Sequence, residues 1–112
     1  MRRLNQLHDE RRRAQRDDVD LPTTATRQWT ETFDIRLLNL SPMGFHARSK
    51  AAFERDQRLR ILLPVVGEVE GQIAWALKGC CGGWFLNAIE PDLYARVLAS
   101  IQNSTGPNST AA

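Results

Sequence analysis

The stretch Phe33–Gly44, which reads FDIRLLNLSPMG, carries the clearest signal for the fold. In its first half, Phe33, Ile35 and Leu37 alternate with other residues at a period of two, which is typical of a β-strand with one buried face. It ends in Ser41–Gly44, where serine, proline and glycine favour a tight turn. A strand followed by such a turn is what a series of short antiparallel strands requires.

The same alternation recurs twice further along the chain, and turn-forming residues at 64–67 and 79–83 delimit it. Its apolar positions are Leu59, Ile61, Leu63, Ile73, Trp75 and Leu77. Five or six short strands are therefore expected, a number typical of a barrel or a sandwich.

Apolar residues at helical spacing follow the last of these strands. Pro91 suits the first turn of a helix, and Leu93, Val97 and Ile101 then recur every four residues. We expect one C-terminal helix that packs on the sheet.

Length and composition indicate a single domain. The chain has 112 residues, of which 42% are hydrophobic and 25% charged, close to the averages for globular domains. Residues 1–18 have few apolar anchors and predict a flexible basic arm, whereas residues 103–112 are rich in Asn, Ser and Thr and predict a disordered tail. The barrel and its helix are expected over residues 19–102.

The sequence also indicates where the protein works. No apolar stretch is long enough to span a membrane, and the N-terminal residues are charged rather than signal-like, so we expect no membrane insertion. Cys80 and Cys81 are adjacent and offer no disulfide framework, which fits a reducing compartment. We therefore expect a cytoplasmic protein.

Metal binding and catalysis find little support in the residue pattern. His8 and His46 lack Cys, Asp or Glu at metal-binding spacing, so no metal is predicted. Ser41, His46 and Asp34 could form a triad only without a nucleophile elbow or an oxyanion loop, so no enzymatic activity is predicted.

The basic residues are distributed unevenly. Net charge is only +2, but six arginines lie within the first 16 residues: Arg2, Arg3, Arg11, Arg12, Arg13 and Arg16. Across the chain, 13 of the 15 basic residues are arginine, whose planar guanidinium pairs bidentately with phosphate or a guanine edge. This bias favours an anionic, nucleotide-like partner.

Two short motifs sharpen that expectation. Arg12-x-x-x-Arg16 is followed, after 22 residues, by Asn39-x-Ser41-x-x-Gly44. In this order the two motifs resemble the RxxxR and [D/N]xSxxG signature of PilZ domains, and the resemblance covers roughly residues 11–101. It implies a mostly β fold, a six-stranded antiparallel barrel with a C-terminal helix.

The resemblance also implies a function. PilZ domains are bacterial receptors for the second messenger cyclic di-GMP, so the ligand would be this guanine dinucleotide, with no cofactor. Output would pass to a downstream protein partner that the sequence does not identify.

Each motif residue has a physical role to play in such a site. Arg12 and Arg16 can present a bidentate fork to guanine O6 and N7 or clamp a phosphate. Asn39 offers both a donor and an acceptor, and Ser41 a hydroxyl. Gly44 would adopt a positive φ or let the ligand approach the backbone.

Other residues leave alternatives open. Trp75 could stack on a guanine base, or it could be a core residue that alternates with Ile73 and Leu77. Arg11 and Arg13 could serve a second cyclic di-GMP molecule or none. Trp29 and Trp84 are interpreted as structural.

Two other functions compete with the cyclic di-GMP receptor. Arginine arms and small barrels also bind single-stranded RNA or DNA, although the small net charge and few exposed-looking aromatics disfavour a nucleic-acid polymer. A PilZ-like adaptor without ligand binding is disfavoured because both motifs are complete.

Overall fold

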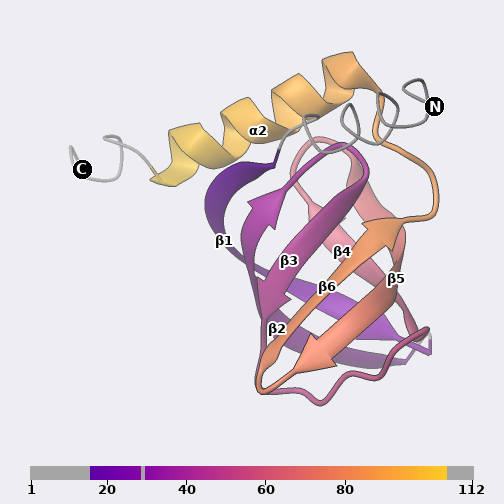
Figure 1. The fold of residues 1–112 in the computed structure, drawn as a ribbon. Coiled ribbons are helices and arrows are strands. Elements are labelled where there is room, and N and C mark those ends of the chain that lie inside the picture. The colour runs from indigo at the N-terminus through magenta and orange to yellow at the C-terminus, as the bar shows by residue number, and fades with distance from the viewer. Residues whose placement is uncertain (1–15, 29, 106–112) are drawn as a thin grey trace, which may run out of the picture.

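The computed structural model describes residues 16–28 and 30–105, and within them six antiparallel strands close a barrel (Figure 1). The elements are β1 (Asp17–Arg27), β2 (Glu31–Leu40), β3 (Gly44–Arg48), β4 (Arg58–Leu63), β5 (Gly67–Leu77), β6 (Cys80–Phe85) and the helix α2 (Pro91–Thr105). Around the barrel the strands follow the order β1-β2-β3-β6-β5-β4. The predicted fold class, a six-stranded barrel with a C-terminal helix, is confirmed.

The alternating residues that predicted the strands build the core. Leu37, Ile61 and Ile73 are fully buried inside the barrel, as period-two alternation requires. Helix α2 lies across one end of the barrel, and its Val97 and Ile101 are buried there (Figure 1). No helix in the described part of the chain is long and apolar enough to cross a membrane.

Two predicted boundaries are corrected. Strand β1 begins at Asp17, two residues before the expected start at residue 19, because Asp17 and Asp18 pair with Leu40 and Asn39. Helix α2 continues to Thr105, so residues 103–105 of the expected tail are helical; glycine and proline follow in the sequence and favour a helix end there. The predicted arm lies almost wholly outside the described residues.

The strand register shifts at three places, and one of them changes the face on which a tryptophan lies. In β5, Ile73 pairs with Gly83 but Trp75 pairs with Gly82, so an extra residue forms a bulge between them. Strict alternation would have kept Trp75 on the face of Ile73. The bulge instead turns Trp75 outward, where it is 44% exposed.

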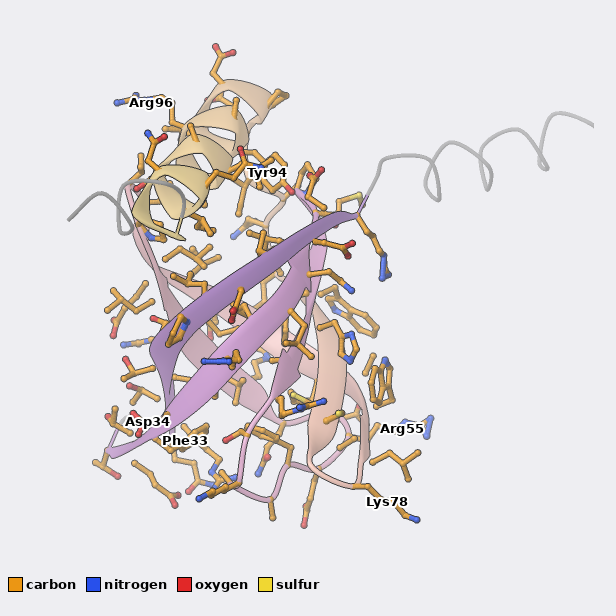
Figure 2. The ribbon with its side chains drawn as sticks, turned by 90° about the vertical axis from the view of Figure 1, so that its left-hand side faces the viewer. Phe33, Asp34, Arg55, Lys78, Tyr94 and Arg96 are labelled. Carbon is orange, nitrogen blue, oxygen red and sulfur yellow. The ribbon has the colours of Figure 1, made fainter. Side chains whose placement is uncertain are left out.

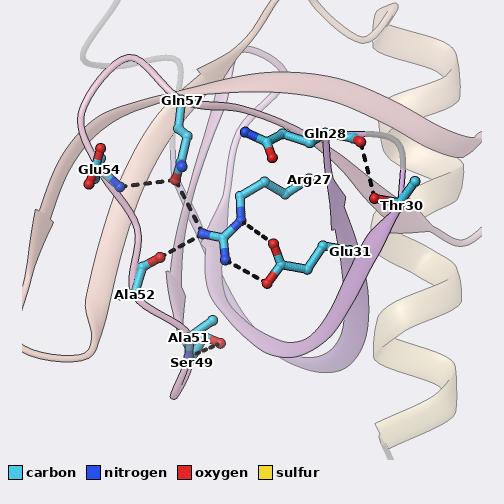
Figure 3. Close-up of polar contacts among 9 residues, drawn as sticks. All are labelled: Arg27, Gln28, Thr30, Glu31, Ser49, Ala51, Ala52, Glu54 and Gln57. Carbon is cyan, nitrogen blue, oxygen red and sulfur yellow. Dashed lines mark hydrogen bonds and ion pairs between the residues drawn. The ribbon is translucent and has the colours of Figure 1, made fainter.

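Arg27, the last residue of β1, makes several polar contacts at the end of the barrel remote from α2 (Figure 3). Its guanidinium donates to both carboxylate oxygens of Glu31, at 3.2 and 3.0 Å, and to the carbonyl oxygen of Ala52 at 2.6 Å. It also contacts Gln57 at 3.4 Å and lies 5.0 Å from the Phe33 ring centroid. Hydrogen bonding and the charge of Arg27 together lower the pKa of the Glu31 carboxyl. We call this set the Arg27 network.

At the opposite end of the barrel, Tyr94 connects α2 to two strands. Its hydroxyl contacts the Asp17 carboxylate and the carbonyl oxygen of Leu40, so α2 is tied to the start of β1 and the end of β2. Figure 2 shows Tyr94 on α2 at one end of the barrel, whereas Phe33 and Asp34 lie at the other end.

Candidate ligand-binding site

The turn between β2 and β3, Ser41–Gly44, is held together by its own serine. The backbone N–H groups of Met43 and Gly44 donate to Ser41 Oγ at 3.1 and 3.0 Å, and the Ser41 N–H donates to the Gly44 carbonyl oxygen at 3.0 Å. Both bonds to Oγ use oxygen lone pairs, so the hydroxyl proton is left for a further acceptor. We call this segment the motif turn.

Backbone contacts with the end of β6 and with the segment between β6 and α2 hold the motif turn in place. The N–H of Phe85 donates to the Met43 carbonyl oxygen, and the N–H of Ile89 to the Pro42 carbonyl oxygen, both at 2.8 Å. Gly44 does not adopt a positive φ, in contrast to one expectation. It is needed because a Cβ there would lie 2.6 Å from the Gly83 carbonyl oxygen.

Five residues form a row across five neighbouring strands of the barrel. Cross-strand pairing connects Asp18 to Asn39, Asn39 to His46, His46 to Gly82, and Gly82 to Trp75. Residues that pair directly share one face of a sheet, and the residues flanking the row, such as Leu40, Phe45 and Cys81, are buried. The row therefore lies on the outer face. We call it the cross-strand row.

The side chains of the row contact one another. Nδ2 of Asn39 lies 3.4 Å from Nδ1 of His46, and the His46 and Trp75 ring centroids are 5.4 Å apart. The Trp75 indole lies over Gly82, where a Cβ would be only 2.5 Å from its Nε1. One side of the indole thus rests on the backbone of β6 while the residue remains 44% exposed.

Trp75 is therefore a surface residue, and the alternative that placed it in the core is wrong. The bulge in β5 is the physical reason, because it cancels the alternation with Ile73. Trp84 is 48% exposed as well, so its interpretation as a structural residue remains a prediction, and Trp29 lies outside the described residues. Whether Trp75 stacks on a base remains a prediction.

Asn39 has an unmet hydrogen-bonding group. Its Oδ1 is buried and, among the described residues, has no hydrogen-bond partner. Leaving a buried acceptor unsatisfied costs about 1–3 kcal/mol. A ligand donor that reaches this oxygen would recover that free energy, which makes Asn39 the strongest ligand-binding candidate in the row.

Arg16 is placed near the motif turn by strand register. Asp17 pairs with Leu40, and Arg16 and Ser41 are the residues that adjoin this pair in the sequence. Arg16 is exposed, and no ion pair involves it among the described residues. The remaining arginines of the predicted site, Arg11, Arg12 and Arg13, lie outside the described residues.

Three members of the row, Asp18, His46 and Gly82, are not among the site residues predicted from the sequence. His46 was weighed only as a metal ligand or a catalytic base, although counting back from the motif turn would have placed it near Asn39. Gly82 and Gly83 interrupt a strand, which signals a close approach of other groups. Only the order of the strands β3, β6 and β5 in the barrel shows that His46 and Gly82 lie beside Trp75.

The triad considered from the sequence is not assembled in the structure. Asp34 lies seven residues before Ser41 along β2, which corresponds to about 20 Å of extended strand, so these two cannot share a triad. Within the described ranges, no three His, Cys, Asp or Glu residues are grouped to hold a metal ion.

No protein-family model and no curated protein matches the sequence. Among solved structures, the PilZ domain with c-di-GMP of YcgR from Escherichia coli is similar, with a TM-score of 0.57. The alignment covers 88% of this chain and 96% of that chain at 16% sequence identity. At this level of identity the likeness concerns the fold, and the chain has the fold of a PilZ domain.

Proposed function

We propose that this chain is a receptor for cyclic di-GMP, which binds on the outer face of the barrel beside the motif turn. The observation that carries the proposal is the buried, unpartnered Oδ1 of Asn39, in one row with the exposed indole of Trp75. The similar YcgR domain was solved with c-di-GMP. In support, Ser41 of the second motif follows β2 directly, and Arg16 of the first motif directly precedes Asp17, which pairs with Leu40 of β2.

The part of the site that belongs to the barrel, Asn39, Ser41 and Trp75, recognises one guanine base. Oδ1 of Asn39 accepts a hydrogen bond from the base, and the Ser41 hydroxyl donates its free proton to a phosphate oxygen. The exposed face of Trp75 stacks on the base, a contact that contributes about 1–3 kcal/mol in nucleic-acid complexes.

The arm supplies the second half. Arg12 and Arg16 bind guanine or phosphate through their guanidinium groups, and Arg11 and Arg13 are available for a second ligand molecule. Fixing five arm residues on the ligand costs on the order of 5–10 kcal/mol of backbone entropy, about as much as two or three such contacts return. The arm and the barrel are therefore both required, and the arm closes on the ligand. The altered surface is what a downstream partner protein recognises.

Binding of single-stranded RNA or DNA is a second candidate. Trp75 and Trp84 are 44% and 48% exposed on adjacent strands, so the expected scarcity of exposed aromatics, which disfavoured this function, is not found. Exposed aromatics beside a basic arm can stack successive bases. Binding of this kind depends steeply on salt concentration.

Calorimetric titration separates the two candidates. Cyclic di-GMP, cyclic di-AMP, GTP and a random single-stranded oligonucleotide are titrated into the wild type, Arg12→Ala, Asn39→Ala and a control, Lys78→Ala. Lys78 lies in the β5–β6 turn, at the end of the barrel opposite to α2 (Figure 2). We expect the wild type and the control to bind only cyclic di-GMP, and the other two variants to lose at least tenfold in affinity.

Fluorescence adds a second readout. In Trp75→Phe, most of the ligand-induced change in tryptophan fluorescence should disappear, whereas Trp84→Phe should retain it. Absence of heat with all three nucleotides, or salt-dependent binding of the oligonucleotide alone, overturns the cyclic di-GMP proposal.

A further inference from the structure

His46 occupies the middle of the cross-strand row without a role in either sequence motif. It pairs with Asn39 on one side and with Gly82 on the other, and its ring lies 5.4 Å from that of Trp75. Any base that stacks on Trp75 and reaches Asn39 must therefore pass over or beside the imidazole.

We propose that His46 is a further ligand-binding residue, whose Nδ1 accepts a hydrogen bond from Asn39 and whose Nε2–H donates to the guanine base stacked on Trp75. The inference rests on the proposed function and names a contact for guanine within that site.

The contact with Asn39 selects the tautomer. Nδ2 of Asn39 is an N–H donor and lies 3.4 Å from Nδ1 of His46, so Nδ1 must present its lone pair. In a neutral imidazole the single proton is then on Nε2. The opposite amide orientation would turn Nδ2 into the buried position that lacks a partner, where two amide protons would be left unsatisfied instead of one oxygen.

The Nε2–H group is free to meet a ligand. Among the described residues, the one buried side-chain nitrogen or oxygen without a partner is Asn39 Oδ1, so Nε2 of His46, which has no partner there, is not buried. Asn39 and His46 thus offer one acceptor and one donor side by side on the same face.

The donor at Nε2 has an acceptor to meet on guanine, whose O6 and N7 lie on one edge. On adenine the amino group replaces O6, but N7 still accepts a hydrogen bond, and an acceptor beside a donor also fits adenine N6 and N7. The His46 contact therefore adds affinity for the stacked base rather than selectivity between cyclic di-GMP and cyclic di-AMP.

Two variants distinguish the contribution of the His46 N–H donor from that of its aromatic ring. His46→Phe keeps an aromatic ring against Trp75 but removes both nitrogens, whereas His46→Gln removes the ring but keeps an N–H donor at about the reach of Nε2. We expect the affinity for cyclic di-GMP to fall about tenfold in His46→Phe, as the loss of one hydrogen bond predicts, and less than threefold in His46→Gln.

The tautomer is measured on the free protein by long-range ¹H–¹⁵N correlation of the imidazole, with His46→Phe to assign the signals against His8. A proton on Nε2 is expected. A proton on Nδ1, or binding of cyclic di-GMP by His46→Phe as tight as by the wild type, overturns this inference while the proposed function stands. If the wild type itself does not bind cyclic di-GMP, the proposed function fails, and this inference fails with it.

Discussion

An arginine stands at each end of strand β1, and the two differ in what they bind. Arg27, at the end remote from α2, donates to Glu31 and to the Ala52 carbonyl oxygen, and its side chain is only 14% exposed. Arg16, just before the first residue of β1, is exposed and has no side-chain partner among the described residues. The first arginine is part of the structural contacts of the barrel, whereas the second is exposed, as the proposed binding role requires.

Neighbouring polar groups show the same contrast. At the far end, Gln57 Oε1 accepts from both Arg27 and the Glu54 N–H, at 3.4 and 3.0 Å (Figure 3). In the cross-strand row, Asn39 Oδ1 is buried and unpartnered. Unsatisfied hydrogen-bonding groups, rather than arginine as such, distinguish the candidate site.

That contrast corrects the interpretation of the arginine content. Arg36, Arg58 and Arg60 form surface ion pairs with Asp20, Glu70 and Glu68, at 3.3, 4.0 and 3.8 Å. Together with Arg27, they bind carboxylates of this chain rather than an external anion. The preference for arginine over lysine is therefore partly structural.

The largest expected effect is a loss of stability at one of two adjacent glycines of β6. Substitution of the other glycine is expected to reduce ligand affinity instead. In Gly83→Ala, the new Cβ would lie 2.1 Å from the Gln72 carbonyl oxygen, a backbone atom that cannot move without parting β5 from β6. We expect the free energy of unfolding to fall by about 3 kcal/mol. Urea denaturation measures the change.

Gly82→Ala is the matched control. Here the Cβ would meet the exposed Trp75 ring, at 2.5 Å from Nε1, and the ring can swing away. We expect a loss of less than about 1 kcal/mol in stability but at least tenfold in cyclic di-GMP affinity, because the stacking surface moves. Unchanged affinity in Gly82→Ala would show that Trp75 does not hold the ligand.

A second prediction concerns the Arg27 network. Arg27→Ala leaves the Ala52 carbonyl oxygen without its side-chain donor and removes one of the two donors to Gln57 Oε1, so we expect the free energy of unfolding to fall by about 2 kcal/mol. Arg58→Ala, whose contact with Glu70 is long and exposed, should lose less than about 0.5 kcal/mol.

Ligand binding tests whether the two ends are independent. Because the Arg27 network lies at the opposite end from the motif turn, cyclic di-GMP affinity in folded Arg27→Ala should stay within twofold of the wild type. Calorimetry under conditions where the variant is fully folded gives this value. A tenfold loss would mean that the far end is coupled to the site.

Features of the fold that depend on residues close together in the sequence could be predicted, whereas features that depend on strand pairing could not. Alternation at Leu59, Ile61 and Leu63 and the turn at Ser41–Gly44 are local patterns, and the structure has the strands and the turn they predict. The face on which Trp75 lies depends on a bulge, which shifts the alternation without any mark in residue type.

The composition of the candidate site depends on longer-range order. Asn39 and His46 meet through one hairpin, but Trp75 joins them only because β6 lies between β3 and β5. A period-two pattern contains no information on which strands become neighbours. The roles of Arg11, Arg12 and Arg13 remain predictions, since these residues lie outside the described part of the chain.

The smallest expected effect tests the tie between α2 and the site. In Tyr94→Phe, the hydroxyl contacts with Asp17 and the Leu40 carbonyl oxygen are lost, and we expect about 1 kcal/mol lower stability at neutral pH. Asp17 adjoins Arg16, so cyclic di-GMP affinity should also fall slightly, by about twofold, which corresponds to about 0.4 kcal/mol.

The pH dependence of stability tests whether the Tyr94 hydroxyl is the cause of the stability difference between the wild type and Tyr94→Phe. Burial raises the pKa of Tyr94 above its ordinary value, and the hydrogen bond to Asp17 raises it further. The folded state thus holds this proton more tightly than the unfolded state, so the stabilisation is complete below the ordinary tyrosine pKa of about 10 and is lost as pH rises beyond it. Since Tyr94 is the sole tyrosine, the wild-type advantage over Tyr94→Phe should shrink from pH 9 upward in urea denaturation. Parallel curves for the two proteins across this range would show that the hydroxyl does not tie α2 to β1.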